Sequence, residues 1–278
     1  RLAGSRRGLT LAPSCFEARA VTGIRHGARF SRIQFSLALA ALLVVAGLAW
    51  LWLLAAGQAM ATMRSDAPLA GLALAMMTPG AAVPYLVATA LMWLVMMVAM
   101  MTPAVLPMML VFRSLDRGPG GAADALWFGG GYLVAWSAFG VLAALVQWWL
   151  HEHGLLAGMA LAASPKLAGA ILIAAGLWQL TPLKAACLAH CRGPMGFFLK
   201  HWRSGRGGAL AMGLRHGLFC IGCCWMLMAL MFAGGAMSVA TMAALALFIL
   251  AERVLPGGDW VSWGAGLGLL GLGAVMVW

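Results

Sequence analysis

Long apolar stretches alternate along this chain with short polar connections that are rich in arginine and lysine. Seven stretches lie near the length of about 20 residues that a helix needs to cross a bilayer. They cover residues 33–57, 85–112, 125–150, 166–183, 212–233, 237–251 and 260–278. No stretch has the alternating pattern of a membrane β-barrel strand, and backbone in lipid must satisfy its own hydrogen bonds. The pattern therefore predicts an all-α protein, a polytopic membrane bundle of about seven transmembrane helices.

The composition agrees with this prediction. Hydrophobic residues make up 64% of the 278 residues and charged residues only 9%. A soluble domain of this length cannot bury that much apolar surface in its core. We expect the lipid bilayer to be the main partner of the chain.

The basic residues indicate how the helices are oriented. The formal net charge is +11, and if the N-terminus is cytoplasmic, every basic residue except Arg64 and Lys166 falls in a cytoplasmic segment. This is the distribution that the positive-inside rule requires. The charge therefore indicates topology, with anionic headgroups as counter-charge, and no nucleic acid partner is needed to explain it.

The chain divides into two parts. Residues 1–32 are rich in arginine and lack apolar periodicity, which predicts a loosely ordered basic cytosolic tail. Residues 33–278 contain all the apolar stretches and form one predicted transmembrane helical domain.

The second apolar stretch is rich in methionine. Met96, Met97, Met100 and Met101 lie near its middle, and Pro103 and Pro107 follow. At helical spacing these methionines share neighbouring faces, and thioethers are soft, uncharged ligands that suit Cu(I). Methionine is also a common filler of irregular apolar cores, so core packing stays open as the alternative.

Cysteines are concentrated in one region. Five of the six fall between Cys187 and Cys224, and most are spaced for a shared helix face. Cys187 and Cys191 are four residues apart, and so are the members of the series His216, Cys220 and Cys224. Both groups lie toward the predicted cytoplasmic ends of their helices, where thiols stay reduced, which favours a metal or redox role over a structural disulfide.

These residues predict a soft-metal site. Cys187, Cys191 and Cys220, together with Cys223 or Cys224, have the number and softness of ligands for Zn(II) or Cu(I), and His216 is an alternative fourth ligand. Lys184, Arg192 and Arg215 are close in sequence and would favour thiolates. The alternative is that cysteine serves only as a small buried residue of membrane helices.

Three motifs also resemble a known family. They are WxxMMxAMMxP from Trp93 to Pro103, QxTPLKxxCLxxCRxP from Gln179 to Pro194, and GxxHGxxCxGCCWxLM from Gly213 to Met228. Together with Glu252-Arg253, they are similar to a bacterial integral membrane family described as predicted metal-binding, of unknown function. The resemblance covers most of residues 85–278. It implies metal binding and a bacterial inner membrane location, and it implies no particular reaction.

Other residues predict packing and neutralisation. Arg253 is expected to neutralise its neighbour Glu252, and Glu252 is also a candidate proton or metal ligand. Gly129, Gly130 and Gly131 predict a close approach of two helices. The glycines between Gly264 and Gly273 predict tight packing within the bundle or between copies of a homo-oligomer.

We therefore expect a membrane protein that binds a soft metal, with copper(I) favoured and zinc as the alternative, and that transports or delivers it. Two other hypotheses stay open. One is a thiol-disulfide redox protein that exchanges disulfides between the cysteine groups, and the other is a non-catalytic subunit or assembly factor of a membrane metalloenzyme. Neither a phosphate-binding glycine loop nor a Ser/His/Asp arrangement occurs in the sequence, and whether the protein is an enzyme is left open.

Overall fold

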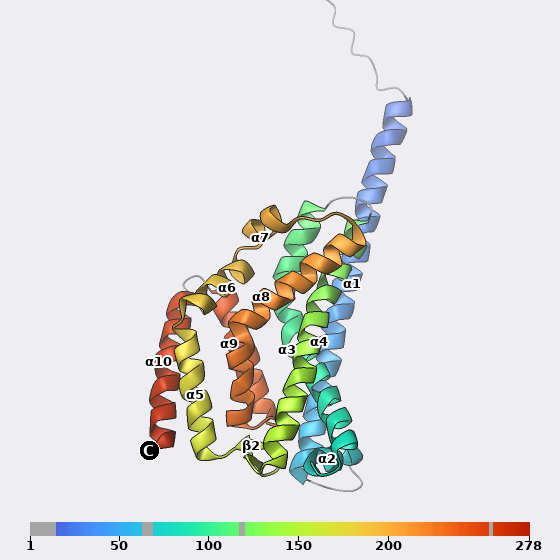
Figure 1. The fold of residues 1–278 in the computed structure, drawn as a ribbon. Helices are drawn as coiled ribbons and strands as arrows, with labels where there is room; N and C mark the ends of the chain where they lie inside the picture. The colour runs from blue at the N-terminus through green and yellow to red at the C-terminus, as the bar shows by residue number, and fades with distance from the viewer. Residues whose placement is uncertain (1–14, 63–68, 117–119, 256–257) are drawn as a thin grey trace, which may run out of the picture.

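The computed structural model describes residues 15–62, 69–116, 120–255 and 258–278. These residues form helices joined by short connections, with one small hairpin (Figure 1). The helices are α1 (Cys15–Thr62), α2 (Ala70–Met77), α3 (Ala82–Leu115), α4 (Gly121–Glu152), α5 (Pro165–Gln179), α6 (Pro182–Arg192), α7 (Pro194–His201), α8 (Gly205–Gly234), α9 (Val239–Val254) and α10 (Gly258–Val277). Strands β1 (Leu156–Ala157) and β2 (Ala162–Ala163) pair antiparallel, with Leu156 opposite Ala163.

The prediction of an all-α fold is confirmed. Within the described ranges, five helices are long and apolar enough to cross a membrane: α1 over Phe35–Thr62, α3, α4, α8 and α10. The bent pair α5 and α6 brings the number to six if the two helices are counted as one span. With 16 residues, α9 is about 24 Å long, shorter than the hydrocarbon core of about 30 Å. The number of seven spans and the cytoplasmic N-terminus stay predictions.

The predicted tail is partly helical. Residues 15–32, for which the sequence predicts loose order, belong to α1, and residues 1–14 lie outside the described part. The division into a basic cytosolic tail and a transmembrane domain stays a prediction. A helix that is already nucleated by an apolar span extends at little cost through residues such as Ala, Arg and Glu.

The predicted fourth span is broken. α5 ends at Gln179, and α6 begins at Pro182 at an angle of 66° to it. Thr181 caps α6, and its hydroxyl accepts a hydrogen bond from the backbone N–H of Lys184 at 3.2 Å. Proline fits the first turn of a helix but cannot continue the preceding one. The break directs the cysteines of α6 toward α8.

Glycines bring α4 and α8 into close contact. A Cβ on Gly131 would lie 2.2 Å from the carbonyl oxygen of Leu210, and one on Gly213 would lie 1.9 Å from the carbonyl oxygen of Phe128. A Cβ on Gly217 would lie 2.6 Å from the side chain of Ala135. The backbones can approach this closely only without side chains. Close helix contact, predicted from Gly129–Gly131, is therefore confirmed at Gly131.

The glycines of α10 divide between two faces. Gly266 and Gly273 face α5, where they pack against Gln179 and Ile173. A Cβ on Gly264, Gly268 or Gly271 would meet nothing within 4 Å. The predicted tight packing therefore occurs within the bundle, and contact between copies stays a prediction.

Pro103 leaves one backbone carbonyl of α3 without its helical hydrogen bond, and a side chain of α1 donates to that carbonyl instead. Pro103 has no N–H to donate to the carbonyl of Ala99. The indole Nε1 of Trp50, on α1, donates to that oxygen at 3.2 Å instead. This contact fixes α1 against the methionine-rich part of α3.

The two ends of the bundle differ. α6 and α7 lie at the end from which the N-terminal half of α1 projects, and α2 and the hairpin lie at the opposite end (Figure 1). Basic segments that the sequence predicts on one side of the membrane, such as α6 and α7, thus lie at the same end of the bundle. Arg64 and Arg117 lie outside the described residues.

Candidate metal-binding site

Four thiols from two helices meet inside the bundle. Cys191, on α6, interacts electrostatically with Cys220 and Cys223 on α8. The Sγ atoms of Cys223 and Cys224 are 3.3 Å apart, and the Cys223 thiol donates to the Cys220 carbonyl at 3.1 Å. Cys220, Cys223 and Cys224 are at most 1% exposed, and Cys191 is 9% exposed. We call Cys191, Cys220, Cys223 and Cys224 the thiol cluster.

Polar groups from α4 converge on Cys220. The Tyr132 hydroxyl lies 3.0 Å from its Sγ, and the Trp136 indole donates to the same atom at 3.2 Å. Tyr132 is also 3.7 Å from the Sδ atom of Met101. The close α4–α8 packing places these two side chains one turn apart against a single sulfur, to which the Trp136 indole donates.

An arginine reaches into the thiol cluster. The Nη2 atom of Arg253, on α9, is 2.7 Å from Cys220 Sγ, 3.3 Å from Cys224 Sγ and 4.0 Å from Cys223 Sγ. Its Nη1 atom donates to the Ala104 carbonyl at 3.5 Å. Helical spacing could not predict this contact, because Arg253 is 30 residues from Cys223 along the chain. Its place in the Glu252-Arg253 motif was the one available hint.

The expected partners of the charged residues are corrected by the structure. Glu252 is not neutralised by Arg253: its carboxylate forms a buried ion pair with Lys184 and accepts hydrogen bonds from Gln179 and Ser262. The two neighbours lie on different sides of α9. Glu252 faces α6 and α10, whereas Arg253 faces α3 and α8.

The cations expected to act on the thiols are also different. Lys184 is engaged by Glu252, Arg192 pairs with Asp259 at 2.7 Å, and Arg215 lines a surface pocket. Arg253 is the residue that contacts the sulfurs. Proximity in sequence pointed to the wrong basic residues, since a helix directs successive side chains to different faces.

Cys187 lies apart from the thiol cluster. It is half-buried, and a Cβ on Gly222 would lie 2.9 Å from its Sγ. In the described part of the chain, its thiol makes no hydrogen bond to the other cysteines. Helical spacing predicts that Cys187 joins Cys191 and Cys220 in one site. The structure does not bring Cys187 together with them.

His216 lies one helical turn before Cys220 and is fully buried. Its ring stacks on Phe128 and Tyr132, with centroid distances of 5.8 and 5.5 Å, and meets Phe197 edge-on at 5.4 Å. Neither ring nitrogen has a hydrogen-bond partner among the described residues. Buried polar atoms without partners are rare and call for an explanation.

The methionines predicted as soft ligands are all in the core. Met96, Met97, Met100 and Met101 are at most 2% exposed. Met101 reaches the thiol cluster through Tyr132, while Met97 packs against Gly140 of α4. Met100 lines an apolar pocket with Trp50 and Pro103. The stripe adjoins the thiols at one end, and both its packing role and its proposed ligand role are compatible with these contacts.

No group of three or more His, Cys, Asp or Glu side chains in the described ranges is arranged to hold a metal ion. The thiol sulfurs instead contact one another and the Arg253 guanidinium. Four soft donors are nevertheless gathered in one buried place. Their chemistry fits Cu(I), which accepts thiolate and thioether ligands at low coordination number.

The fold and site define a helical protein with apolar helices that could span a membrane and with a buried, arginine-bound thiol cluster. The family model described as PpoB2, copper chaperone, matches residues 90–276. This range contains both cysteine helices and covers more than half of the chain, so the protein belongs to the PpoB2 copper chaperone family. No curated protein and no solved structure matches the chain.

Proposed function

We propose that the protein is an integral membrane copper chaperone that binds Cu(I) at the thiol cluster and delivers it to a partner in the bacterial inner membrane. The observation that carries the proposal is the convergence of Cys191, Cys220, Cys223 and Cys224 in one buried site. Membership of the copper chaperone family supports copper as the cargo.

The charge of the site favours Cu(I) over Zn(II). Arg253 is buried against the sulfurs and places a positive charge beside any bound ion. A divalent ion would be repelled more strongly than a monovalent one in this low-dielectric environment. Zn(II) also requires four ligands in a closed tetrahedron, whereas two or three sulfurs are enough for Cu(I).

Arg253 also makes the binding reversible. Its guanidinium contacts the sulfurs that the ion needs, so it withdraws when Cu(I) binds and returns when Cu(I) leaves. The returning hydrogen bonds, from Nη2 to Cys220 and Cys224, stabilise the metal-free cluster. A cargo protein needs sites that are favourable yet escapable, and this exchange provides them.

Metal analysis of purified protein tests the proposal. We expect the variant in which Cys220, Cys223 and Cys224 are all replaced by Ser to lose bound copper after loading with Cu(I). The matched control is Cys187→Ser, which we expect to keep its copper because Cys187 faces Gly222 and lies outside the cluster. Equal copper content in the triple variant and the unchanged protein would contradict the proposal.

The redox hypothesis rests on one specific contact, the 3.3 Å between the sulfurs of Cys223 and Cys224. Mass spectrometry after rapid alkylation distinguishes the two functions. A chaperone keeps these thiols reduced through a loading and release cycle, whereas a thiol-disulfide protein accumulates a mixed disulfide with its partner. A trapped mixed disulfide together with no copper binding would replace the proposal by the redox function.

A further inference from the structure

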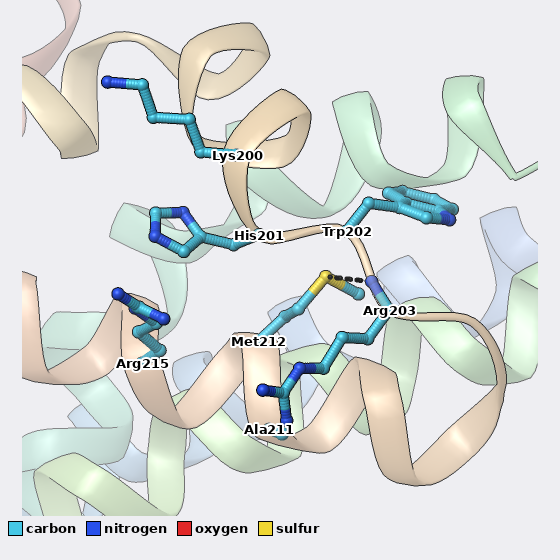
Figure 2. A pocket seen from close by; sticks show the side chains of 7 residues that line it. All are labelled: Lys200, His201, Trp202, Arg203, Ala211, Met212 and Arg215. Atoms are coloured by element: carbon cyan, nitrogen blue, oxygen red, sulfur yellow. Dashed lines mark hydrogen bonds between the residues drawn. The ribbon is translucent and has the colours of Figure 1, made fainter.

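A pocket of about 200 Å³ opens beside the connection from α7 to α8. It is lined by Lys200, His201, Trp202, Arg203, Ala211, Met212 and Arg215. Figure 2 shows the His201 ring and the Arg215 guanidinium facing each other. The Met212 side chain reaches from α8 toward the backbone of Arg203. The Lys200 side chain extends away from this centre (Figure 2). The function proposed above assigns no role to this pocket.

The charged residues that line the pocket are all basic. Arg203, Arg215 and Lys200 line it, and no acidic residue does. Two acids of the described part of the chain form ion pairs elsewhere: Glu252 with Lys184, and Asp259 with Arg192. Converging cations at the mouth of a pocket raise the local concentration of anions and speed their association.

The floor of the pocket leads into the protein through soft donors. Met212 is only 2% exposed and accepts a hydrogen bond from the backbone N–H of Arg203 through its Sδ atom at 3.3 Å. Met212, His216 and Cys220 follow one another at four-residue intervals on α8. Each interval corresponds to about 6 Å along the helix axis and keeps the same face. The series thus joins the pocket to the thiol cluster.

His216 is the middle member of this series, and its two free ring nitrogens are otherwise unexplained. The Phe197 ring lies 5.0 Å from the ring of His201 at the pocket and 5.4 Å from that of His216. The two imidazoles are therefore neighbours of one aromatic ring. A neutral imidazole is a good ligand for copper, so the unpartnered nitrogens give His216 the capacity to hold a passing ion.

We propose that the basic pocket receives Cu(I) bound to an anionic thiolate carrier and that Met212 and His216 pass the ion to Cys220. This inference rests on the proposed function, because it names the form of its cargo. A monovalent ion held by two thiolates has a net negative charge, which the arginines attract. In the transfer, the carrier's Cu–S bonds break and bonds to Met212, His216 and then Cys220 form. Copper stays Cu(I), and the released carrier thiolates take up the protons that the cluster thiols lose.

The charge of the pocket is tested with purified protein and two Cu(I) donors, an anionic dithiol complex and a neutral thioether complex. We expect Arg215→Ser to slow loading from the anionic donor about tenfold at low ionic strength, and high salt to remove the difference. Loading from the neutral donor should not change. The control is Arg206→Ser, which removes the same charge from the start of α8 outside the pocket. Equal rates for both arginine variants would overturn the proposal.

The relay is tested by comparing the rate of loading with the final copper content. Met212→Leu and His216→Phe keep the shape of the buried side chains. We expect both to slow loading about tenfold, the effect of raising the barrier by about 1.4 kcal/mol, while the final copper content stays unchanged. The matched controls are Met195→Leu, at an exposed position of α7, and His190→Phe, at a half-buried position of α6.

Two results would overturn the relay. Unchanged rates in both variants would show that the ion enters elsewhere. A lower final copper content in His216→Phe would make His216 a ligand of the thiol cluster itself and not a relay. Failure of the proposed function has a separate signature, since the triple cysteine variant would then keep its copper whatever the rates are.

Discussion

Arg253 is the residue that decides the character of the thiol cluster. A guanidinium has several fixed donors and is never deprotonated in proteins, so it can bind more than one sulfur at once. In this structure it joins Cys220 and Cys224 to the Ala104 carbonyl of α3. It therefore contributes both to the metal-free site and to the position of α9.

Replacing Arg253 tests this role. We expect Arg253→Met to lower the free energy of unfolding of the copper-free protein by about 1.5–3 kcal/mol, the range for a hydrogen bond to a charged group. Denaturant titration in detergent, followed by tryptophan fluorescence, measures the change. Arg206→Met is the control at an exposed position and should stay within about 0.5 kcal/mol of the unchanged protein. Equal stability of the two variants would contradict the structural role of Arg253.

At the scale of elements, the contact of α4 with α8 positions the site. The glycines of this interface allow Tyr132 and Trp136, on α4, to reach Cys220 on α8. A side chain at Gly131 or Gly213 would collide with a backbone carbonyl, which cannot move as a flexible side chain can. The contacts of Tyr132 and Trp136 with Cys220 depend on this separation of the two helices.

We expect Gly213→Ala to destabilise the protein by about 1–3 kcal/mol or more, because the new Cβ forces the helices apart. Gly130→Ala is the control: Gly130 lies on α4, the partner helix of α8 in this interface, yet a Cβ there meets nothing within 4 Å. That variant should be neutral or more stable, since alanine favours a helix over glycine by up to about 1 kcal/mol. Thermal unfolding of both proteins provides the measurement, and a similar loss in both would refute the close contact.

For the molecule as a whole, a buried polar network joins the C-terminal helices. Lys184 of α6 and Glu252 of α9 form an ion pair in which both side chains are 1% exposed. Ser262 of α10 donates to the same carboxylate at 2.6 Å, and Gln179 of α5 donates to it at 3.0 Å. Four helices thus meet at one carboxylate, and Glu252 is adjacent in sequence to Arg253. The network therefore sets the height and rotation of α9 relative to the thiols.

Removing one charge of this pair should be costly. We expect Lys184→Met to lower the free energy of unfolding by about 3–5 kcal/mol, because it leaves a buried carboxylate without its cation. The double variant Lys184→Met with Glu252→Met should recover much of this loss, since neither charge then remains buried. Chemical denaturation of the three proteins checks the prediction. A double variant that is less stable than Lys184→Met would show that the pair itself, and not the unpaired charge, determines stability.

The helical segments of this protein, and which residues share a face of one helix, could be predicted from the sequence alone. The length and apolar character of its segments determined the all-α fold, because helical backbone must be hydrogen-bonded internally in an apolar environment. Spacing along α8 determined that His216, Cys220 and Cys224 share a buried face, since a helix repeats every 3.6 residues. The family resemblance to metal-binding membrane proteins agrees with the copper chaperone family found for residues 90–276.

What the sequence could not determine were the relations between helices. Cys187 and Cys191 have the same spacing as the α8 pair, yet only Cys191 reaches the thiol cluster. The break at Pro182 sets the direction of α6, and the rotation of α6 about its axis decides which cysteine faces inward. Likewise, Arg253 meets the thiols and Glu252 meets Lys184 because α9 packs between two groups of helices.

The chemistry of the cysteines between Cys187 and Cys224 could thus be predicted, but their contact with Arg253 could not. Softness and helical spacing are properties of residues close in the chain, so the sequence by itself determined the candidate ligands. The guanidinium against the sulfurs, the separate position of Cys187 and the basic pocket above Met212 were decided only by the tertiary structure. Each depends on contacts between distant segments, whose geometry is set by packing and not by local periodicity.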